Sequence, residues 1–161
     1  MSCQIGGQVA GQTVYLDGPY GHLKLPSGGF KGVGLIAGGV GLAPLLGILR
    51  ELRLKKDSSP VKLIYGNRIE SQIACIDELH ALPHSRSEEI ILALSEPPTD
   101  WTGYVGMIDQ TLIEQSFSFD KNQSWIYLIC GPWSMIQSVE RSLINLGIPS
   151  DRILSERFDY D

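Results

Sequence analysis

The sequence predicts an α/β fold, a three-layer doubly wound sheet of about five parallel strands preceded by a short antiparallel β segment. From about Gly32 onward, short β-rich runs alternate with helical patterns, which is typical of βαβ units around a parallel sheet. These runs are apolar throughout, which favours strands covered on both faces. Residues 13–25 instead alternate polar and apolar side chains around a Gly-Pro turn, which is typical of antiparallel strands exposed on one side.

Five runs predict the strands of the sheet. They are VGLIA from Val33, VKLIY from Val61, IILAL from Ile90, WIYLIC from Trp125 and the weaker RILSERF near the end of the chain. Three stripes of apolar residues at helical spacing predict helices that each turn one face to the sheet. The stripes are Leu42, Leu45, Leu46 and Leu49; Ile69, Ile73, Ile76 and Leu79; and Ile136, Val139, Leu143 and Leu146.

The last of these helices has the clearest end signals. Ser134 and Gln137 predict a capping box at its start. Gly147 can take the left-handed position at its end, and Pro149 prevents the helix from continuing.

Composition and charge exclude several classes of function. The 161 residues are 43% hydrophobic and 19% charged, as in an ordinary soluble globular protein. The net charge of -5 argues against a nucleic-acid partner, because binding to phosphates needs clustered Lys and Arg. Residues 33–49 carry no charge, but glycines and Pro44 interrupt them and they fall short of the roughly 20 residues that cross a bilayer. With no signal-peptide pattern at the start, we expect a cytoplasmic protein without a membrane span.

The segment GGVGLAP, which begins at Gly38, follows the first predicted strand and opens the first predicted helix. In a doubly wound sheet this is where ligands bind, and free N–H groups at a helix N-terminus attract phosphate. Pro44 suits the first helical position, where no N–H is needed. A phosphate-binding loop and a tight strand-to-helix turn both stay open, because short glycine motifs are weak evidence.

Two common nucleotide folds fit this sequence poorly. No Gly-Lys-Ser/Thr follows the glycines, which excludes a P-loop for triphosphates. The second strand ends in Gly66, Asn67 and Arg68 rather than in the acidic residue that holds the ribose in standard dehydrogenases.

Several motifs in order carry a resemblance to one family. They are GPYGHL, LIAGGVGLAPLLGIL, LIYGNR, LSEPPTDWTGYVGMI, LICGPWSMIQSVERSL and SERF. From about Thr13 to its end, the chain resembles the ferredoxin–NADP reductase superfamily, within its oxygenase-reductase and cytochrome b5 reductase-like members. The resemblance implies a flavoprotein in which NAD(P)H gives a hydride to FAD, and the flavin passes electrons to an acceptor such as a ferredoxin or an oxygenase component.

The resemblance also implies roles for individual residues. Cys130 would lie against the nicotinamide, and Glu156 and Phe158 would approach the flavin and nicotinamide as further catalytic residues. The residues implied to bind the nucleotide are Gly38, Gly39, Gly41, Pro44, Gly66, Asn67, Arg68, Ser95, Glu96, Gly131, Pro132 and Met135. Gly18, Pro19, Tyr20 and Gly21 would lie near the flavin or its phosphates.

The three cysteines, Cys3, Cys75 and Cys130, are an odd number without C-x-x-C spacing, which favours a reducing compartment and no metal centre. Cys75 lies on a predicted helical stripe and is expected to be a buried structural thiol. For Cys130 the same interpretation remains an alternative to contact with the nicotinamide. A cysteine nucleophile is disfavoured, because no histidine in its sequence context could activate it.

The choice of cofactor can be argued from Ser95 and Glu96. NADP-using relatives have a serine and an arginine after the third strand, where this chain has Ser95 and Glu96. A carboxylate would repel the 2′-phosphate and could accept hydrogen bonds from ribose hydroxyls. We therefore expect NADH to be preferred over NADPH.

The resemblance begins late, because an Arg-x-Tyr-Ser type motif and most of the FAD barrel, which precede GPYG in family members, are missing from the sequence. We expect residues 1–30 to be the C-terminal remnant of an FAD-binding β-barrel and residues 31–161 to be the NAD(P)-binding α/β domain. Such a fragment is expected to bind nucleotide weakly, hold FAD poorly, turn over little and self-associate through uncovered apolar surface. The alternative is a nucleotide-binding or interaction module without catalysis.

Overall fold

The computed structural model describes residues 21–81, 88–117 and 124–157, together with Gly11, Thr13 and Tyr15. Its strands are β1 (Gly32–Gly38), β2 (Val61–Asn67), β3 (Glu88–Leu94), β4 (Tyr104–Val105), β5 (Trp125–Gly131) and β6 (Ile153–Arg157). Its helices are α1 (Leu42–Leu54), α2 (Ile76–Ala81), α3 (Gln110–Ser116) and α4 (Trp133–Asn145), with short 3-10 turns at Gly39–Gly41, Glu70–Gln72 and Ser150–Arg152.

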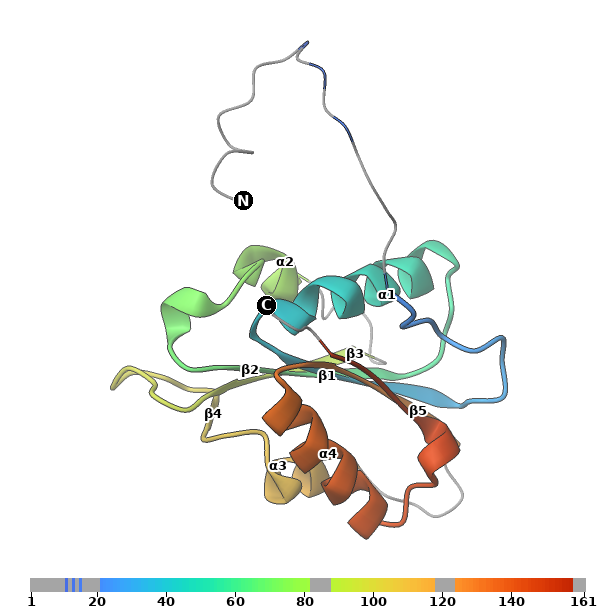
Figure 1. Cartoon of the computed structure of the whole chain (residues 1–161). Helices are drawn as coiled ribbons and strands as arrows, with labels where there is room; N and C mark the ends of the chain where they lie inside the picture. Colours follow the sequence, from blue (N-terminus) through green and yellow to red (C-terminus); the bar gives the residue numbers. More distant parts are fainter. Residues whose placement is uncertain are drawn as a thin grey trace.

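The described strands form one sheet in the order β4-β3-β2-β1-β5-β6, and every pairing is parallel. Helices α1 and α2 cover one face of the sheet, and α3 and α4 cover the other (Figure 1). The chain runs outward from β1 to β4 and then returns to the other side of β1. The loops after β1 and β5 therefore leave the sheet in opposite directions, which opens a crevice at this end. The predicted doubly wound fold is confirmed, with β4 as a sixth strand.

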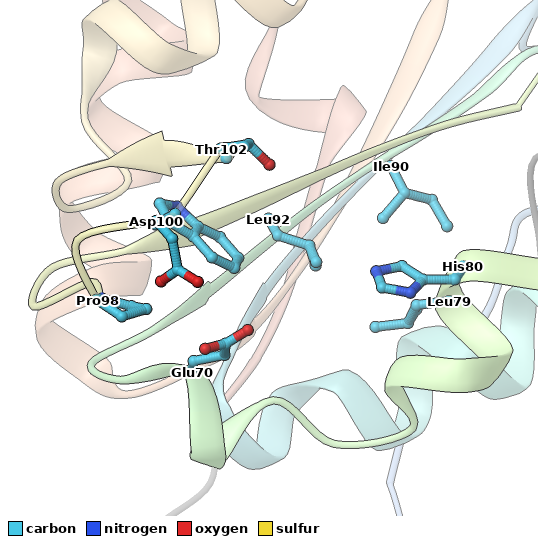
Figure 2. A pocket seen from close by; sticks show the side chains of 10 residues that line it. Glu70, Leu79, His80, Ile90, Leu92, Pro98, Asp100 and Thr102 are labelled. Carbon is cyan, nitrogen blue, oxygen red and sulfur yellow. The ribbon is translucent and has the colours of Figure 1, made fainter.

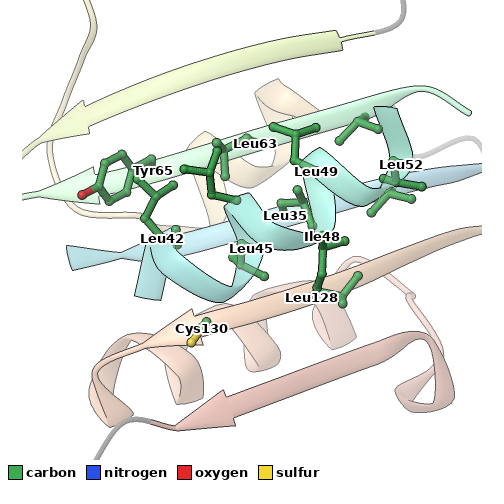
Figure 3. Packing of buried hydrophobic residues seen from close by; sticks show 14 of the residues in the cluster. Leu35, Leu42, Leu45, Ile48, Leu49, Leu52, Leu63, Tyr65, Leu128 and Cys130 are labelled. Carbon is green, nitrogen blue, oxygen red and sulfur yellow. The ribbon is translucent and has the colours of Figure 1, made fainter. Parts of the chain in front are cut away.

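The core explains why the first βα unit could be predicted. All seven residues of β1 are buried, as the continuous apolar run indicates for a central strand. On one face, Leu45 and Leu49 of α1 pack over Leu35, Leu63 and other buried residues of the strands (Figure 3). A separate buried cluster lies on the opposite face of the sheet, and α3 and α4 contribute side chains to it.

The prediction of a second helix is wrong for the first half of its range. Ile69 and Ile73 have extended backbones, and only Ile76–Ala81 is α-helical. The Ala74 N–H donates to the Tyr65 hydroxyl rather than within a helix, and Cys75 has a left-handed φ of 55°. Cys75 is consequently exposed, and the expectation of a buried thiol there is also wrong.

Two helix starts differ from their predictions. Helix α4 begins at Trp133 with Pro132 as its N-cap residue, and no side chain caps it, so the predicted capping box does not form. Pro44 is the third residue of α1 rather than the first, a position that still lies in the first turn, where N–H groups have no helical acceptor. The left-handed conformation predicted for Gly147 is confirmed by its φ of 88°.

The segment before β1 packs on the α/β domain. Leu23, Leu25 and Phe30 are partly buried against the cluster beneath α1. The described residues from Gly21 to Lys31 contain no strand, and most of the remaining predicted antiparallel segment lies outside the described residues. None of the described helices is both long and apolar enough to cross a membrane.

Candidate nucleotide site

A cavity of about 390 Å³ opens at the carboxyl ends of β1, β2, β3 and β5. Eight of the residues that the sequence assigned to nucleotide binding line it: Gly38, Gly39, Gly66, Asn67, Arg68, Ser95, Pro132 and Met135. They lie at or just after the ends of four strands that are far apart in sequence. The crevice of the sheet thus gathers the separate motifs into one site, as expected for a doubly wound fold.

Glycines allow the loops around this cavity to pack closely. A Cβ on Gly38 would lie 2.5 Å from Met135 Sδ and 3.0 Å from Pro132 Cδ. A Cβ on Gly66 would lie 2.9 Å from Ile108 Cδ1. Any larger residue at these positions would have to displace the walls of the cavity.

Gly41 and Pro44 do not line the cavity, although the sequence grouped them with Gly38 and Gly39. Gly41 is buried, and a Cβ there would lie 2.1 Å from the Cys130 carbonyl oxygen. Gly41 is therefore a packing residue that lets the start of α1 touch the end of β5. The glycine segment thus combines a tight turn at Gly41 with a cavity wall at Gly38 and Gly39, and its role as a phosphate-binding loop stays a prediction.

The donors at the cavity suit an anionic, hydrogen-bonding ligand. Within the described part of the chain, Asn67 Nδ2 is buried and has no hydrogen-bond acceptor. A buried donor without a partner is costly, and a ligand in the cavity could satisfy it. Pro132 and Ser134, at the start of the 13-residue helix α4, also line the cavity, and the first-turn N–H groups of a helix attract phosphate.

Five residues that the sequence missed also belong to the lining. They are Gln72, Gly106, Met107, Ile108 and Ser134. Ser134 was assigned to a capping box instead, and Met107 and Ile108 follow a strand that the sequence did not indicate. The sequence signal for this part is the TGYVGMI portion of the family motif, which contains Met107 and Ile108.

Arg68 and Glu96 form an ion pair at the rim, with 3.1 Å between Arg68 Nη1 and Glu96 Oε2. Two backbone hydrogen bonds hold their loops together, from the Ser95 N–H to the Asn67 carbonyl and from the Glu96 N–H to the Arg68 carbonyl. Both side chains are 59% exposed, so the pair is accessible to a ligand. The predicted nucleotide-binding arginine is thus already engaged by the carboxylate that was predicted to select NADH.

Cys130 is the last residue but one of β5, and its buried side chain belongs to the cluster beneath α1 (Figure 3). Burial raises the pKa of the thiol to about 12, with a further contribution from the carboxylate of Glu156. Cys130 therefore stays protonated at neutral pH, which agrees with the sequence argument against a cysteine nucleophile. A Cβ on Gly131, which follows it, would lie 3.1 Å from the Gly38 backbone.

Thiol labelling should separate the two cysteines that the structure describes. Cys75 is exposed and is expected to react with iodoacetamide at about pH 8, whereas buried Cys130 is expected to stay unlabelled until the chain unfolds. Peptide mapping by mass spectrometry, with and without urea, measures this difference. Equal labelling of Cys130 and Cys75 in the folded chain would contradict the burial of Cys130.

The predicted flavin-side residues are only partly placed. Gly18, Pro19, Tyr20 and Phe158 lie outside the described residues. Glu156 lies on β6 opposite Cys130 on β5, and its Oε2 accepts a 3.0 Å hydrogen bond from the Leu23 N–H. The structure therefore brings Glu156 near Cys130 but outside the lining of the nucleotide cavity.

A second cavity, of about 470 Å³, lies between α2, β3 and the loop after β3 (Figure 2). The carboxylates of Glu70 and Asp100 lie at one end and His80 at the other, with Leu92 between them. None of the residues predicted to bind nucleotide lines this cavity. Although it is larger, its two carboxylates make it the poorer place for a pyrophosphate. Among the described residues, no three His, Cys, Asp or Glu side chains are grouped to hold a metal ion.

Comparisons with known proteins agree with this arrangement. Residues 35–141 match the family model for the oxidoreductase NAD-binding domain. NADH-cytochrome b5 reductase 1 of Candida glabrata is 31% identical over 163 residues, which cover 99% of this chain and 57% of that protein. The protein of the same name from Mycosarcoma maydis is 33% identical over 162 residues, covering 99% of this chain and 50% of its own length. The chain thus spans about half the length of the curated relatives it matches.

Solved structures show the same likeness. The cytochrome b5 reductase domain of Ulva prolifera nitrate reductase superposes with a TM-score of 0.72 at 26% identity, over 79% of this chain and 50% of that one. The CS-b5R domains of human Ncb5or, in the NAD+ form, give a TM-score of 0.70 at 27% identity, over 78% of this chain and 36% of that one.

Proposed function

Because this chain belongs to the oxidoreductase NAD-binding domain family, within the ferredoxin–NADP reductase superfamily, we propose that it is the nicotinamide-nucleotide-binding part of a flavin-dependent reductase. The whole reductase would transfer a hydride from NADH to FAD and pass the electrons to a protein acceptor. The names of the relatives, NADH-cytochrome b5 reductases, support this class of reaction.

The observation that carries the proposal is the cavity at the sheet crevice. It joins two glycine loops, the start of α4 and the unpartnered amide of Asn67 at one place. A dinucleotide needs these features together: close backbone approach, N–H groups for the pyrophosphate and a donor for a polar substituent.

The chain's own residues would bind and orient the nucleotide. Gly38, Gly39 and Pro132 would border the nicotinamide half, while Arg68 and Ser95 would border the adenosine half. FAD, when bound by the whole protein, supplies the hydride acceptor, and Gly21 with the residues before it would lie on the flavin side. Fixing the distance and angle between the two rings is the main contribution that a protein makes to such a transfer.

Cys130 is the proposed residue at the hydride-transfer end. As a protonated, buried thiol it would offer a small polarizable neighbour to a flat ring and would exclude water. This role needs no thiolate, which agrees with its raised pKa.

The remaining assignments concern the whole protein. We place the boundary between the flavin remnant and the NAD(P)-binding domain between residues 30 and 31. A ferredoxin, an oxygenase component or a cytochrome would be the electron acceptor, and the reductase would be cytoplasmic. The reductase titles among the relatives support an acceptor of this kind.

Nucleotide binding to the chain itself tests the proposed site. Met107→Glu places a carboxylate in the lining and is expected to weaken NADH binding at least tenfold, by about 1.4 kcal/mol or more, as measured by calorimetric titration. Val105→Glu is the matched control, because Val105 is similarly exposed, at 62% against 71%, but does not line the cavity. Equal affinities for both variants would contradict the proposed site.

The alternative is a nucleotide-binding module without catalysis. Cys130→Ser in the full-length protein distinguishes the two, because a reductase should lose flavin reduction rate at unchanged NADH affinity. A binding module would show no flavin reduction in either form.

A further inference from the structure

The end of β6 joins two parts of the chain that are far apart in sequence. The Leu23 N–H donates a 3.0 Å hydrogen bond to Glu156 Oε2. Glu156 in turn stands opposite Cys130 in the parallel register of β5 and β6. The Glu156 side chain therefore links the segment before β1 to the strand that ends at the proposed hydride-transfer position.

Gly21 lies directly on the same carboxylate. Its φ of +103° is one that residues with side chains rarely adopt. In addition, a Cβ at this position would be 2.6 Å from Glu156 Oε1. Position 21 thus requires glycine for two reasons: the backbone has a positive φ, and the Glu156 carboxylate occupies the place of a Cβ.

The next residue of β6 makes a contact in the other direction. The Arg157 guanidinium lies over the Trp133 ring, 5.2 Å from its centroid. Trp133 stands between Pro132 and Ser134, which both line the nucleotide cavity. The end of β6 therefore touches the segment before β1 through Glu156 and the start of α4 through Arg157.

We propose that Glu156 is a positioning residue, whose carboxylate holds the backbone at Gly21 and Leu23 against the nucleotide edge of the domain. The role needs a hydrogen-bond acceptor at the Oε2 position and needs neither the negative charge nor a transferable proton. It differs from the catalytic role that the family resemblance implies for Glu156. The contact stands on the structure alone, while its effect on NADH rests on the proposed function.

Hydrogen exchange at the Leu23 amide tests the contact in the whole chain. Glu156→Ala removes the acceptor and is expected to speed exchange at Leu23 about tenfold. Glu156→Gln keeps a carbonyl oxygen of the same reach, so exchange should stay within about threefold of the wild-type rate.

Gly21→Ala provides an independent route to the same loss. Its methyl group would displace the carboxylate, so exchange at Leu23 should rise as in Glu156→Ala. Gly28→Ala is the matched control, because Gly28 has a similar φ of +82° with nothing within 4 Å of its Cβ. That variant shares the backbone strain but not the contact, and Leu23 exchange should not change.

NADH affinity gives the second readout. Glu156→Ala and Gly21→Ala should weaken NADH binding about threefold, with Glu156→Gln and Gly28→Ala at the wild-type value. If Glu156→Gln behaves like Glu156→Ala in both measurements, the charge is required and the positioning role is overturned. Unchanged Leu23 exchange in Glu156→Ala would overturn it as well. Failure of the proposed function is distinct, because wild-type chain would then not bind NADH while the exchange pattern remained as expected.

Discussion

Replacing Gly41 by alanine is expected to lower the free energy of unfolding by about 3 kcal/mol and to weaken NADH binding about tenfold. The added Cβ would lie 2.1 Å from the Cys130 carbonyl oxygen and 2.4 Å from its carbonyl carbon. These are backbone atoms of a central strand, so they cannot move aside as a flexible side chain could. Relief requires a shift of the start of α1, which carries Gly38 and Gly39 at the cavity wall with it. Urea unfolding and NADH titration measure the two effects.

A matched variant separates this clash from the effect of alanine itself. Gly41 has a φ of -60°, so alanine fits its backbone conformation and only the contact is changed. Gly47, on the same helix, has nothing within 4 Å of its Cβ. Gly47→Ala should raise the free energy of unfolding by about 0.5–1 kcal/mol, because alanine favours the helix. A loss of only a few tenths of a kcal/mol in Gly41→Ala would show that α1 does not pack on Cys130 as described.

Replacing Glu96 by alanine is expected to strengthen NADPH binding about tenfold, by about 1.4 kcal/mol, and to weaken NADH binding slightly. In the wild-type chain the carboxylate would repel a 2′-phosphate and also holds the Arg68 guanidinium at 3.1 Å. Its removal takes away the repulsion and frees Arg68, which suits phosphate well. The NADH complex loses an acceptor for the ribose hydroxyls. Dissociation constants for both nucleotides, measured at one ionic strength, give the ratio.

Two further variants test whether the Glu96 carboxylate and Arg68 cause the change in nucleotide preference. Glu114→Ala on α3 changes the net charge equally, at an exposed position outside the cavity lining, and should leave the ratio unchanged. Adding Arg68→Ala to Glu96→Ala should remove the gain for NADPH. Tighter NADPH than NADH binding by the wild-type chain, with no response to Glu96→Ala, would contradict the predicted preference.

The sequence predicted the central strands β1, β2 and β5 because they are mostly buried and therefore mostly apolar, whereas the edge strand β6, with Ser155 and Glu156, gave the weaker signal. Strand β4 has no such signal, because it consists of Tyr104 and Val105 alone. Its position depends on hydrogen bonds that form in the folded chain. The Gly106 N–H donates to the Leu94 carbonyl, and Trp101 Nε1 donates to the Tyr104 carbonyl. Such tertiary contacts leave no periodic pattern.

The sequence predicted the parts of the cavity lining that lie in motifs after strands. It did not predict the parts that depend on the conformation of a loop. Gly38 and Pro132 lie in motifs directly after strands, so the topology alone brings them together. Met107 also lines the cavity, but it follows β4, a strand of two residues that the sequence did not indicate. The helical spacing of Ile69 and Ile73 was misleading, because the Tyr65 hydroxyl and the left-handed Cys75 hold that stretch in another conformation.

The shortness of β4 bears on edge-to-edge association between copies of this chain. Among the described strands, β4 pairs only with Ala93 and Leu94, so the first five residues of β3 have no described strand partner on that side. Open strand edges recruit other strands, and charged side chains discourage this. This stretch of β3 begins with Glu88 and Glu89, which ion pairs with Arg53 and Lys62 keep in place. A second copy that paired a strand with this edge would place that strand beside Glu88 and Glu89, which disfavours such pairing.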